Sequence, residues 1–436
     1  MTQLLLHNAV LVDIDPLKVE RGSLRLKDGT IAERGGLKAG VGDQVIDCNG
    51  AVVLPGLVNG HTHLYSALAV GMPAPPRNPK NFLEILELVW WRLDRALDAE
   101  TVRASAHIGA IEALRCGTTT LIDHHASPSF IRGSLDMVEQ GIASAGLRGV
   151  LCYEATDRHG HAGAEEGIAE NERYLALCAQ RRDGRFAGLV GAHASFTLED
   201  RSMAALASLA ERTGCGVHIH VAEDPCDEAA CRRDCGKPLI ERLGGFGLLN
   251  PRTVFAHGTH LDARAVEAIN QAGLHLAHNT RSNMNNAVGY APLGAVKCPV
   301  MLGTDGIGGD MFAESRTAWF KSRDAHAGLS PADIVAMLVN AARRASSALG
   351  VTLGVLQPGA AADIVITDYA PFTPIDSGNL LGHLLFGLSS THVRHVLIGG
   401  RPALRDRAVV SCDAPEAARN ARTLAADLWK RMVALR

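Results

Sequence analysis

The sequence lacks the features of a membrane-spanning, secreted or nucleic-acid-binding protein. No uncharged stretch is long enough to cross a bilayer. The first residues carry no basic segment, and their apolar run is too short for a signal peptide. The formal net charge of −3 gives no sign of a nucleic acid or an anionic membrane as a partner. We therefore expect a cytoplasmic protein that acts on a small molecule.

Cysteine is also scarce. The 10 cysteines among 436 residues are too few for a disulfide scaffold, and they are spread along the chain. Cys226, Cys231 and Cys235 form one group, but their spacing matches no common zinc pattern and a fourth ligand is missing nearby. We interpret them as reduced thiols in a loop after a strand.

The two ends of the chain are rich in predicted strands. Residues 2–48 contain short strands with a hairpin turn at Asp28-Gly29, and residues 363–367 and 393–398 are further strands, the second followed by Gly399-Gly400. We predict one composite β-sandwich domain built from residues 1–55 and 361–415. A helix rich in Ala, Leu and Arg over residues 416–436 closes the chain.

The middle of the chain, residues 56–360, alternates short apolar runs with helical patterns, which indicates βα units and a parallel sheet. The predicted strands are residues 52–59, 118–123, 149–153, 189–192, 216–220, 253–256, 274–277 and 300–303. Eight parallel strands in series favour an α/β fold of the (β/α)₈ TIM-barrel type. Periodicity alone is also compatible with a doubly wound sheet. The choice between the two folds therefore rests on the residues that end the strands.

Polar residues follow these strands with unusual regularity. They are His61 and His63 after the first strand, His124 and His125 after the second, His193 after the fourth, His220 and Glu223 after the fifth, His257 after the sixth, His278 after the seventh and Asp305 after the eighth. In a barrel, these strand ends meet at one mouth, where the active sites of this fold lie. Imidazoles with one carboxylate form a ligand set suited to a borderline divalent metal ion.

The His-x-His pair has a direct structural meaning. Residues i and i+2 of a strand point to the same side, so His61 and His63 can reach one ion at roughly 2.0–2.1 Å. A lone His-x-His is a weak signal. Matched with histidines that end later strands, it becomes a strong one.

Several segments resemble a known family. Residues 55–63 (Pro-Gly-Leu-Val-Asn-Gly-His-Thr-His) resemble the first-strand signature of the amidohydrolase superfamily. Residues 218–223, 256–258 and 303–306 resemble its guanine and S-adenosylhomocysteine deaminase branch, which also holds the triazine chlorohydrolases. A narrower resemblance, to the SsnA-type aminohydrolases, is carried by residues 90–98, 123–128, 281–286 and 303–312. Together these likenesses extend over nearly the whole chain.

The resemblance implies a metal site and two further catalytic groups. It assigns His61, His63, His220 and Asp305 as ligands of one divalent ion, with Zn²⁺ favoured over Fe²⁺. It also implies that Glu223 is the proton shuttle and that His257, beside the catalytic Asp305, orients the attacking water. Binuclear relatives carry a carboxylated lysine at the end of the fourth strand. Residues 189–195 contain no lysine, which favours one metal.

The chemistry of these groups suits hydrolytic deamination. A metal with an open position lowers the pKa of bound water and supplies hydroxide near neutral pH. Glu223 can protonate the ring nitrogen and then the leaving amine. The zinc deaminases of the cytidine type share this division of labour but carry Pro-Cys-x-x-Cys, which is absent here.

Three hypotheses therefore stand. The first is deamination of an aminated heterocycle of purine, pterin or pyrimidine type. The second keeps the fold and metal but hydrolyses a cyclic amide or displaces a halide or alkylamine. The third is a metal-binding scaffold without turnover. Glu223 argues against it, because a scaffold does not need an acid beside an open metal position.

Seven further residues are predicted substrate contacts: His278, Arg281, Asn283, His193, His125, Trp90 and Arg158. Each has a structural alternative, such as a loop scaffold for Arg281 and Asn283, or a helix packed on the barrel, instead of a lid, for Trp90. Many relatives have proline where Thr280 stands, so the substrate of the better-known deaminases does not transfer directly. The resemblance also implies a possible homo-oligomer.

Overall fold

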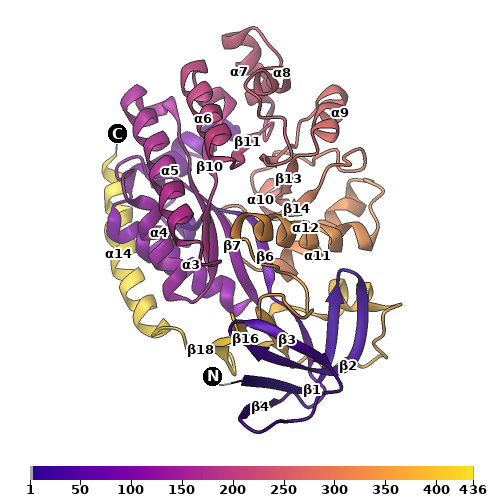
Figure 1. Ribbon diagram of the computed structural model, residues 1–436. Coiled ribbons are helices and arrows are strands. Elements are labelled where there is room, and N and C mark those ends of the chain that lie inside the picture. The colour runs from indigo at the N-terminus through magenta and orange to yellow at the C-terminus, as the bar shows by residue number, and fades with distance from the viewer. Residues whose placement is uncertain (1–2, 436) are drawn as a thin grey trace.

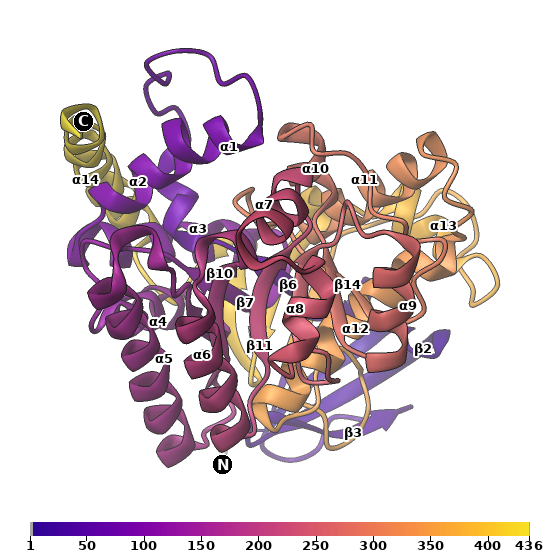
Figure 2. The same ribbon diagram turned by 90° about the horizontal axis from the view of Figure 1, so that it is seen from above.

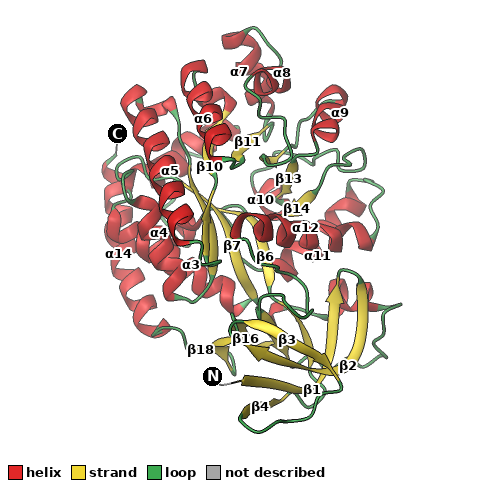
Figure 3. Cartoon of the chain, in the orientation of Figure 1, coloured by secondary structure: helices red, strands yellow, loops and turns green. Residues whose placement is uncertain are grey.

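The computed structural model describes residues 3–435 (Figure 1). A barrel of strands surrounded by helices forms the larger part, and a β-rich part lies beneath it, where the first strands and β16 to β18 lie together (Figure 3). Seen from above, the helices surround the barrel strands (Figure 2).

The barrel consists of eight parallel strands. They are β6 (Leu57–Thr62), β7 (Thr118–His125), β8 (Arg148–Tyr153), β10 (Val190–Ala194, preceded by β9, Phe186–Gly188), β11 (Val217–Val221), β12 (Val254–His257), β13 (His275–His278) and β14 (Val300–Leu302). Hydrogen bonds link them in the orders β6-β7-β8-β9 and β10-β11-β12-β13-β14. Parallel bridges between Thr62 and Asp305 and between Ala155 and Ala192 close the two seams. This is the predicted (β/α)₈ barrel.

The first predicted strand, residues 52–59, is two strands. It divides at Gly56 into β5 (Val52–Pro55) and β6, and β5 pairs with β1 and β15 outside the barrel. A Cβ at Gly56 would lie 2.3 Å from Oγ1 of Thr119, so only glycine allows the chain to cross so close to β7. The other seven predicted strands overlap the observed ones.

The β-rich part is built from both ends of the chain, as predicted. Its further strands are β1 (Gln3–Ile14), β2 (Leu17–Lys27), β3 (Thr30–Gly35), β4 (Asp43–Asp47), β15 (Ile364–Thr367), β16 (Val393–Ile398), β17 (Arg401–Arg405) and β18 (Ala408–Val409). With β5 they form one hydrogen-bonded sheet. The β2–β3 turn has positive φ at Asp28 (50°) and Gly29 (82°), as a type I′ hairpin requires. The limits of the domain remain our prediction, supported by the antiparallel pairing of β15 with β5.

The helices cover the outside of the barrel and part of its mouth. They are η1 (Leu64–Ala69), α1 (Phe82–Ile85), η2 (Leu86–Trp90), α2 (Trp91–Ala96), α3 (Ala99–Arg115), α4 (Ser134–Ser144), η3 (Asp157–His159), α5 (His161–Arg181), η4 (Ser195–Thr197), α6 (Asp200–Thr213), α7 (Pro225–Cys235), α8 (Leu239–Gly245), α9 (Ala263–Ala272), α10 (Thr280–Asn285), α11 (Met311–Asp324), α12 (Pro331–Leu349), α13 (Leu380–Gly382), η5 (His383–Gly387), η6 (Ser390–His392) and α14 (Ala414–Ala434). Within residues 3–435, none is long and apolar enough to cross a bilayer.

Two predictions about local structure need correction. The closing helix begins at Ala414, two residues earlier than predicted, because the side chain of Asp413 accepts a hydrogen bond from the backbone N–H of Glu416 and caps it. Cys226, Cys231 and Cys235 lie on helix α7 and not in a loop, since Asp224 caps that helix and Pro225 occupies its first turn. All three thiols are free.

A buried ion pair joins the barrel to the β-rich part. Arg148, the first residue of β8, donates from Nε and Nη2 to the two carboxylate oxygens of Asp363, at 2.8 and 2.9 Å. The side chains of Arg148 and Asp363 are 8% and 2% exposed. Asp363 also accepts from the backbone N–H of Gly399 at 2.8 Å. Loss of either partner would leave a buried charge without its counter-charge.

We therefore predict that Arg148→Met lowers the free energy of unfolding by about 3–5 kcal/mol, the cost expected when one member of a buried pair is removed. Chemical denaturation followed by circular dichroism measures the change. The matched control is Arg212→Met, whose pair with Glu172 is more than half exposed and worth less than about 1 kcal/mol. Equal stability losses in both variants would contradict the prediction.

Candidate metal centre

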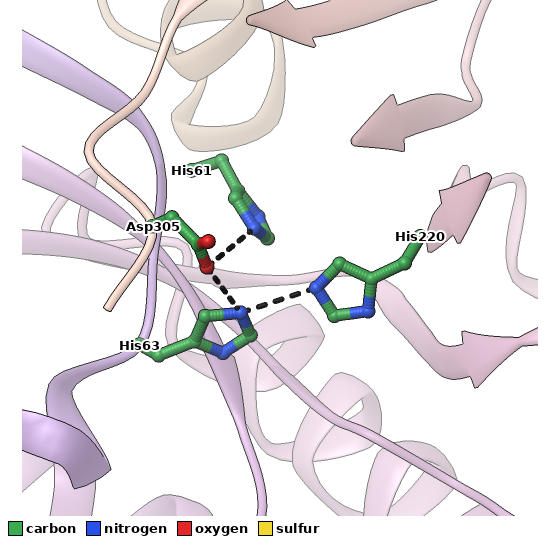
Figure 4. A group of neighbouring side chains, drawn as sticks. All are labelled: His61, His63, His220 and Asp305. Carbon is green, nitrogen blue, oxygen red and sulfur yellow. Dashed lines mark hydrogen bonds and ion pairs between the residues drawn. The ribbon is translucent and has the colours of Figure 1, made fainter. Parts of the chain in front are cut away.

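Four of the predicted residues converge at the mouth of the barrel (Figure 4). His61 and His63 come from the end of β6, His220 from β11, and Asp305 from the segment after β14. Nε2 of His63 lies 3.1 Å from Nε2 of His220 and 3.0 Å from Oδ1 of Asp305. Nε2 of His61 lies 3.6 Å from the same oxygen. One ligand atom from each of the four residues lies within 4.8 Å of all the others.

The backbone sets the protonation of two of these rings. Nδ1 of His63 donates to the carbonyl oxygen of His124 at 2.5 Å, and Nδ1 of His220 donates to that of His193 at 2.9 Å. A carbonyl can only accept, so the proton of each neutral ring sits on Nδ1 and the lone pair of Nε2 faces the cluster. Two such lone pairs at close range repel each other unless a cation lies between them.

His61 is oriented in a similar way. Its Nδ1 lies 2.9 Å from Nε2 of His218, and its own Nε2 is buried with no hydrogen-bond partner. A buried polar atom without a partner is costly, so this nitrogen is matched to a ligand absent from the protein itself. Three imidazole nitrogens and one carboxylate oxygen fit a divalent transition metal ion.

The electrostatics favour a cation at the same place. Burial alone would lower the pKa of His63, but the Asp305 carboxylate raises it to about 9. Burial lowers the pKa of His61 to about 3. The Asp305 carboxylate, which stabilises a positive charge on His63, can in the same position stabilise a bound metal cation.

Three residues at this mouth have the left-handed backbone conformation that favours glycine. They are Ala222 (φ 49°), directly after β11, His257 (φ 76°), the last residue of β12, and Asp305 (φ 54°), three residues after β14. Such conformations cost of order 1–3 kcal/mol each and concentrate at functional sites. They turn the chain at the strand ends around the four-residue cluster.

A carboxyl group and an imidazole lie beside the cluster. Oε2 of Glu223 is 3.5 Å from Nε2 of His257, and this nitrogen is 3.9 Å from Oδ2 of Asp305. Nδ1 of His257 lies 2.8 Å from Oδ1 of Asn283, which fixes the ring. Burial raises the pKa of Glu223 to about 7, so its carboxyl group can both hold and release a proton near neutral pH.

These groups open into a pocket. Its lining residues are His63, Tyr65, Ser66, Phe82, Leu86, Trp90, Trp91, Glu154, His193, Ala194, Phe196, His220, Glu223, Asp224, Cys226, Asp227, Ser282, Asn285, Asn286, Asp305, Gly306 and Ile307. Three of the four cluster residues and Glu223 line it, together with an aromatic wall made by Phe82 of α1, Trp90 of η2 and Trp91 of α2. A flat ring with polar edges suits such a site.

Two of the seven predicted substrate contacts line this pocket, Trp90 and His193. Trp90 ends the turn of π-helix η2, so it belongs to a helix that also borders the mouth. Nε2 of His193 lies 3.4 Å from Oε1 of Glu154.

Two predicted arginines have protein partners. Arg158 donates to Asp94 at 2.8 Å and stacks 4.4 Å above the ring of Trp91. Arg281 donates to Glu314 at 2.6 Å and to the carbonyl oxygen of Gly308 at 2.7 Å. Neither lines the pocket.

The remaining three predicted contacts, His125, His278 and Asn283, do not line the pocket either. His125 is hydrogen-bonded to Oγ of Ser127 at 2.9 Å, and His278 packs edge-on against Tyr290. Asn283 holds His257, as described above. Their contact with a substrate remains a prediction that the geometry does not favour.

Among the polar lining residues that sequence reasoning did not predict, two contact the proposed site residues. Ser282 donates to Oδ2 of Asp305 at 2.5 Å, and Glu154 follows β8 and lies beside His193 and His124. Burial alone would raise the pKa of Glu154, but His193 and His124 together lower it below its ordinary value. The signal for Glu154 was present, since it directly follows the third barrel strand as the other site residues follow theirs.

The chain belongs to the amidohydrolase family, whose model matches residues 52–403. It is therefore a hydrolase. The 5′-deoxyadenosine deaminase of Methanosarcina mazei is 27% identical over 441 residues, covering 99% of this chain and 100% of that protein. The 5-methylthioadenosine/S-adenosylhomocysteine deaminase of Syntrophomonas wolfei is 28% identical over 444 residues, covering 98% and 99%.

Solved structures share the fold. An adenosine deaminase from Xanthomonas campestris with bound zinc superposes with a TM-score of 0.84 at 24% identity, covering 100% of this chain and 99% of that one. The zinc complex of an atrazine chlorohydrolase from Arthrobacter aurescens gives a TM-score of 0.80 at 20% identity, covering 97% and 100%.

Asp227 supports the strained turn that carries Glu223. Its Oδ2 accepts a hydrogen bond from the backbone N–H of Ala222 at 2.9 Å. Burial raises the pKa of Asp227 to about 7. The folded protein therefore favours the protonated side chain. The stability that this group contributes is complete below its ordinary pKa and is lost as the pH rises from about 4 to 7.

We predict that Asp227→Asn, which cannot ionise but still accepts from Ala222, gains stability relative to the wild type as the pH rises. Thermal denaturation of both proteins at pH 5 and pH 8 measures this difference. A difference in denaturation temperature that is the same at both pH values would contradict the prediction.

Proposed function

We propose that this protein is a metal-dependent deaminase of an aminated nitrogen heterocycle. In the reaction, the carbon–nitrogen bond to the amino group breaks, a carbon–oxygen bond to water forms, and ammonia leaves. The observation that carries the proposal is the position of Glu223, a partly buried acid on the pocket side of the four-residue cluster. The names of the relatives favour an adenine-type purine over the pterin and pyrimidine alternatives.

One divalent ion is proposed for the cluster, Zn²⁺ in preference to Fe²⁺. His61, His63 and His220 would bind it through Nε2 and Asp305 through a carboxylate oxygen. When bound, such an ion lowers the pKa of a coordinated water toward neutrality. The zinc in two structures of the same fold supports the choice of metal.

The protein's own groups divide the remaining work. His257, fixed by Asn283, presents Nε2 between Glu223 and Asp305, where it can orient the attacking water. Glu223 can take a proton from that water and deliver it to the ring nitrogen beside the reacting carbon. The proton that remains on the attacking oxygen can then pass through the same carboxyl group to the departing amine, so that ammonia leaves and a carbonyl remains on the ring. The aromatic wall holds the ring flat and keeps bulk water from it.

Several finer features remain proposals of the same kind. They are the membership of the SsnA-type subgroup, a homo-oligomeric state, a cytoplasmic location and the absence of a nucleic acid partner. The motif at residues 90–98, which lines part of the pocket, supports the subgroup.

The metal site can be tested by elemental analysis of the purified protein. We expect about one zinc ion per wild-type chain, and a loss of most of it in His220→Ala, because this change removes one of four ligands. The control is His161→Ala, which changes an exposed histidine on α5 and keeps the metal. Equal metal content in the two variants would contradict the ligand assignment.

Deamination can be tested by ammonia release across aminopurines, adenosine derivatives, aminopterins and cytosine. We expect Glu223→Gln to lower kcat on the best substrate by about 10²–10⁴-fold, the usual contribution of general acid–base catalysis, with its metal retained. Glu241→Gln, an exposed change on the nearby helix α8, serves as the matched control and keeps full activity.

Two results would overturn this assignment. Unchanged activity in Glu223→Gln would remove the proton shuttle. Release of halide or alkylamine from triazines, with no ammonia from any amino heterocycle in the panel, would identify a different leaving group on the same fold.

A further inference from the structure

A second carboxylate approaches the metal cluster from another side. Glu223 lies beside His257 and Asp305, whereas Glu154 lies within 4.8 Å of ligand atoms of His63 and His220. Glu154 is only 4% exposed and lines the pocket. The proposed mechanism does not use it.

The partners of Glu154 leave its oxygens with room for a ligand. Oε1 lies 3.4 Å from Nε2 of His193, and Oε2 lies 3.3 Å from Nδ1 of His124. Both distances exceed the 2.7–3.2 Å of a good N–H···O bond. An ionised carboxylate can accept about four hydrogen bonds. A buried carboxylate with two long contacts is therefore well placed to accept short bonds from a substrate.

The charge of the whole pocket also favours a ligand that offers N–H donors. Its lining contains the carboxyl groups of Glu154, Glu223, Asp224, Asp227 and Asp305, and among residues 3–435 no lysine or arginine lines it. Arg158 and Arg281, which were predicted to contact the substrate, are instead paired with Asp94 and Glu314. A bound dication would offset only part of the negative charge. Such a field attracts cations and N–H donors and repels anions.

We propose that Glu154 is a substrate-binding and specificity-determining residue. It accepts N–H hydrogen bonds from the part of the heterocycle that lies beside the metal and away from Glu223. The pocket would thus select uncharged or protonated rings that present an amino or amidine-like edge, and disfavour rings that present only acceptors or an anionic group there.

This assignment deepens the proposed function, because it names the class of ring that the same site takes. A protonated amidine-like edge offers two N–H donors side by side, which match the two oxygens of one carboxylate. The 2-amino-oxo edge of a guanine-type purine or a pterin offers the same pair without protonation, whereas an adenine-type edge offers it only when its ring nitrogen carries a proton. Glu223 and Glu154 would then address different edges of one ring, the first for proton transfer and the second for recognition.

The test compares two flat probes of the same shape by calorimetry on the metal-loaded protein. Benzamidine is a cation with only N–H donors, and benzamide is neutral with a carbonyl acceptor in place of one nitrogen. We expect the wild type to bind benzamidine at least about tenfold more tightly, as a charge-assisted hydrogen bond provides. In Glu154→Gln, the ratio of the two affinities should fall to near unity.

Asp224→Asn is the matched control. Asp224 also lines the pocket and caps α7 through its bond to the backbone N–H of Cys226, and asparagine keeps this cap. The change removes one negative charge from the pocket without touching Glu154. We expect this variant to retain most of the preference for benzamidine. A disturbed pocket in Glu154→Gln would weaken both probes alike and leave the ratio unchanged.

Each outcome decides between the hypotheses. A ratio that survives in Glu154→Gln, equal binding of the probes to the wild type, or no binding of either would overturn the role of Glu154. Calorimetry needs no turnover. A clear preference for benzamidine without ammonia release from any substrate would therefore reject the proposed function alone, whereas ammonia release without the preference would reject only this inference.

Discussion

The site depends on two hydrogen bonds in which a ring proposed to bind the metal donates to the backbone. Nδ1 of His63 and of His220 each donate to a carbonyl oxygen at the end of a neighbouring strand. Those carbonyls have fixed positions because their strands belong to the barrel. The barrel therefore sets the tautomer and the direction of both rings before any ion arrives, and supporting contacts of this kind tune metal affinity in proteins. His257 follows the same logic with a side-chain partner, Asn283.

The arrangement explains how one pocket can hold acids of different character. Burial raises the pKa of Glu223, which lies 3.5 Å from the ring of His257 and keeps 14% side-chain exposure. Glu154 is more deeply buried, at 4%, but it lies between two imidazoles and its pKa is lowered. A carboxyl group that exchanges protons suits catalysis, and one that stays ionised suits recognition. The environment of each group, more than its residue type, separates the two roles.

Much of the fold and the core of the site could be predicted from the sequence. The strands of the barrel are short apolar runs, and His61, His63, His220 and Asp305 follow them. The resemblance to the amidohydrolases then singled out these four from the other polar residues at the strand ends. The roles of Arg158 and Arg281 could not be predicted, because their partners, Asp94 and Glu314, are 64 and 33 residues away and are fixed only by tertiary packing. The division of the first strand at Gly56 escaped prediction for the same reason, since it depends on the approach of Thr119.

The seam between β6 and β14 determines when the site is completed during synthesis and folding of the chain. The backbone N–H groups of Thr304 and Asp305 donate to the carbonyl oxygen of His61, at 2.9 and 3.0 Å, so the first and last strands of the barrel meet where the ligands lie. These contacts span more than 240 residues of sequence, and such long-range pairings form late in folding. A nascent or truncated chain that ends before β14 has the three histidines of the cluster but lacks Asp305, the carboxylate that completes it. The proposed active centre is therefore assembled only when the chain has been made through Asp305 and the barrel has closed.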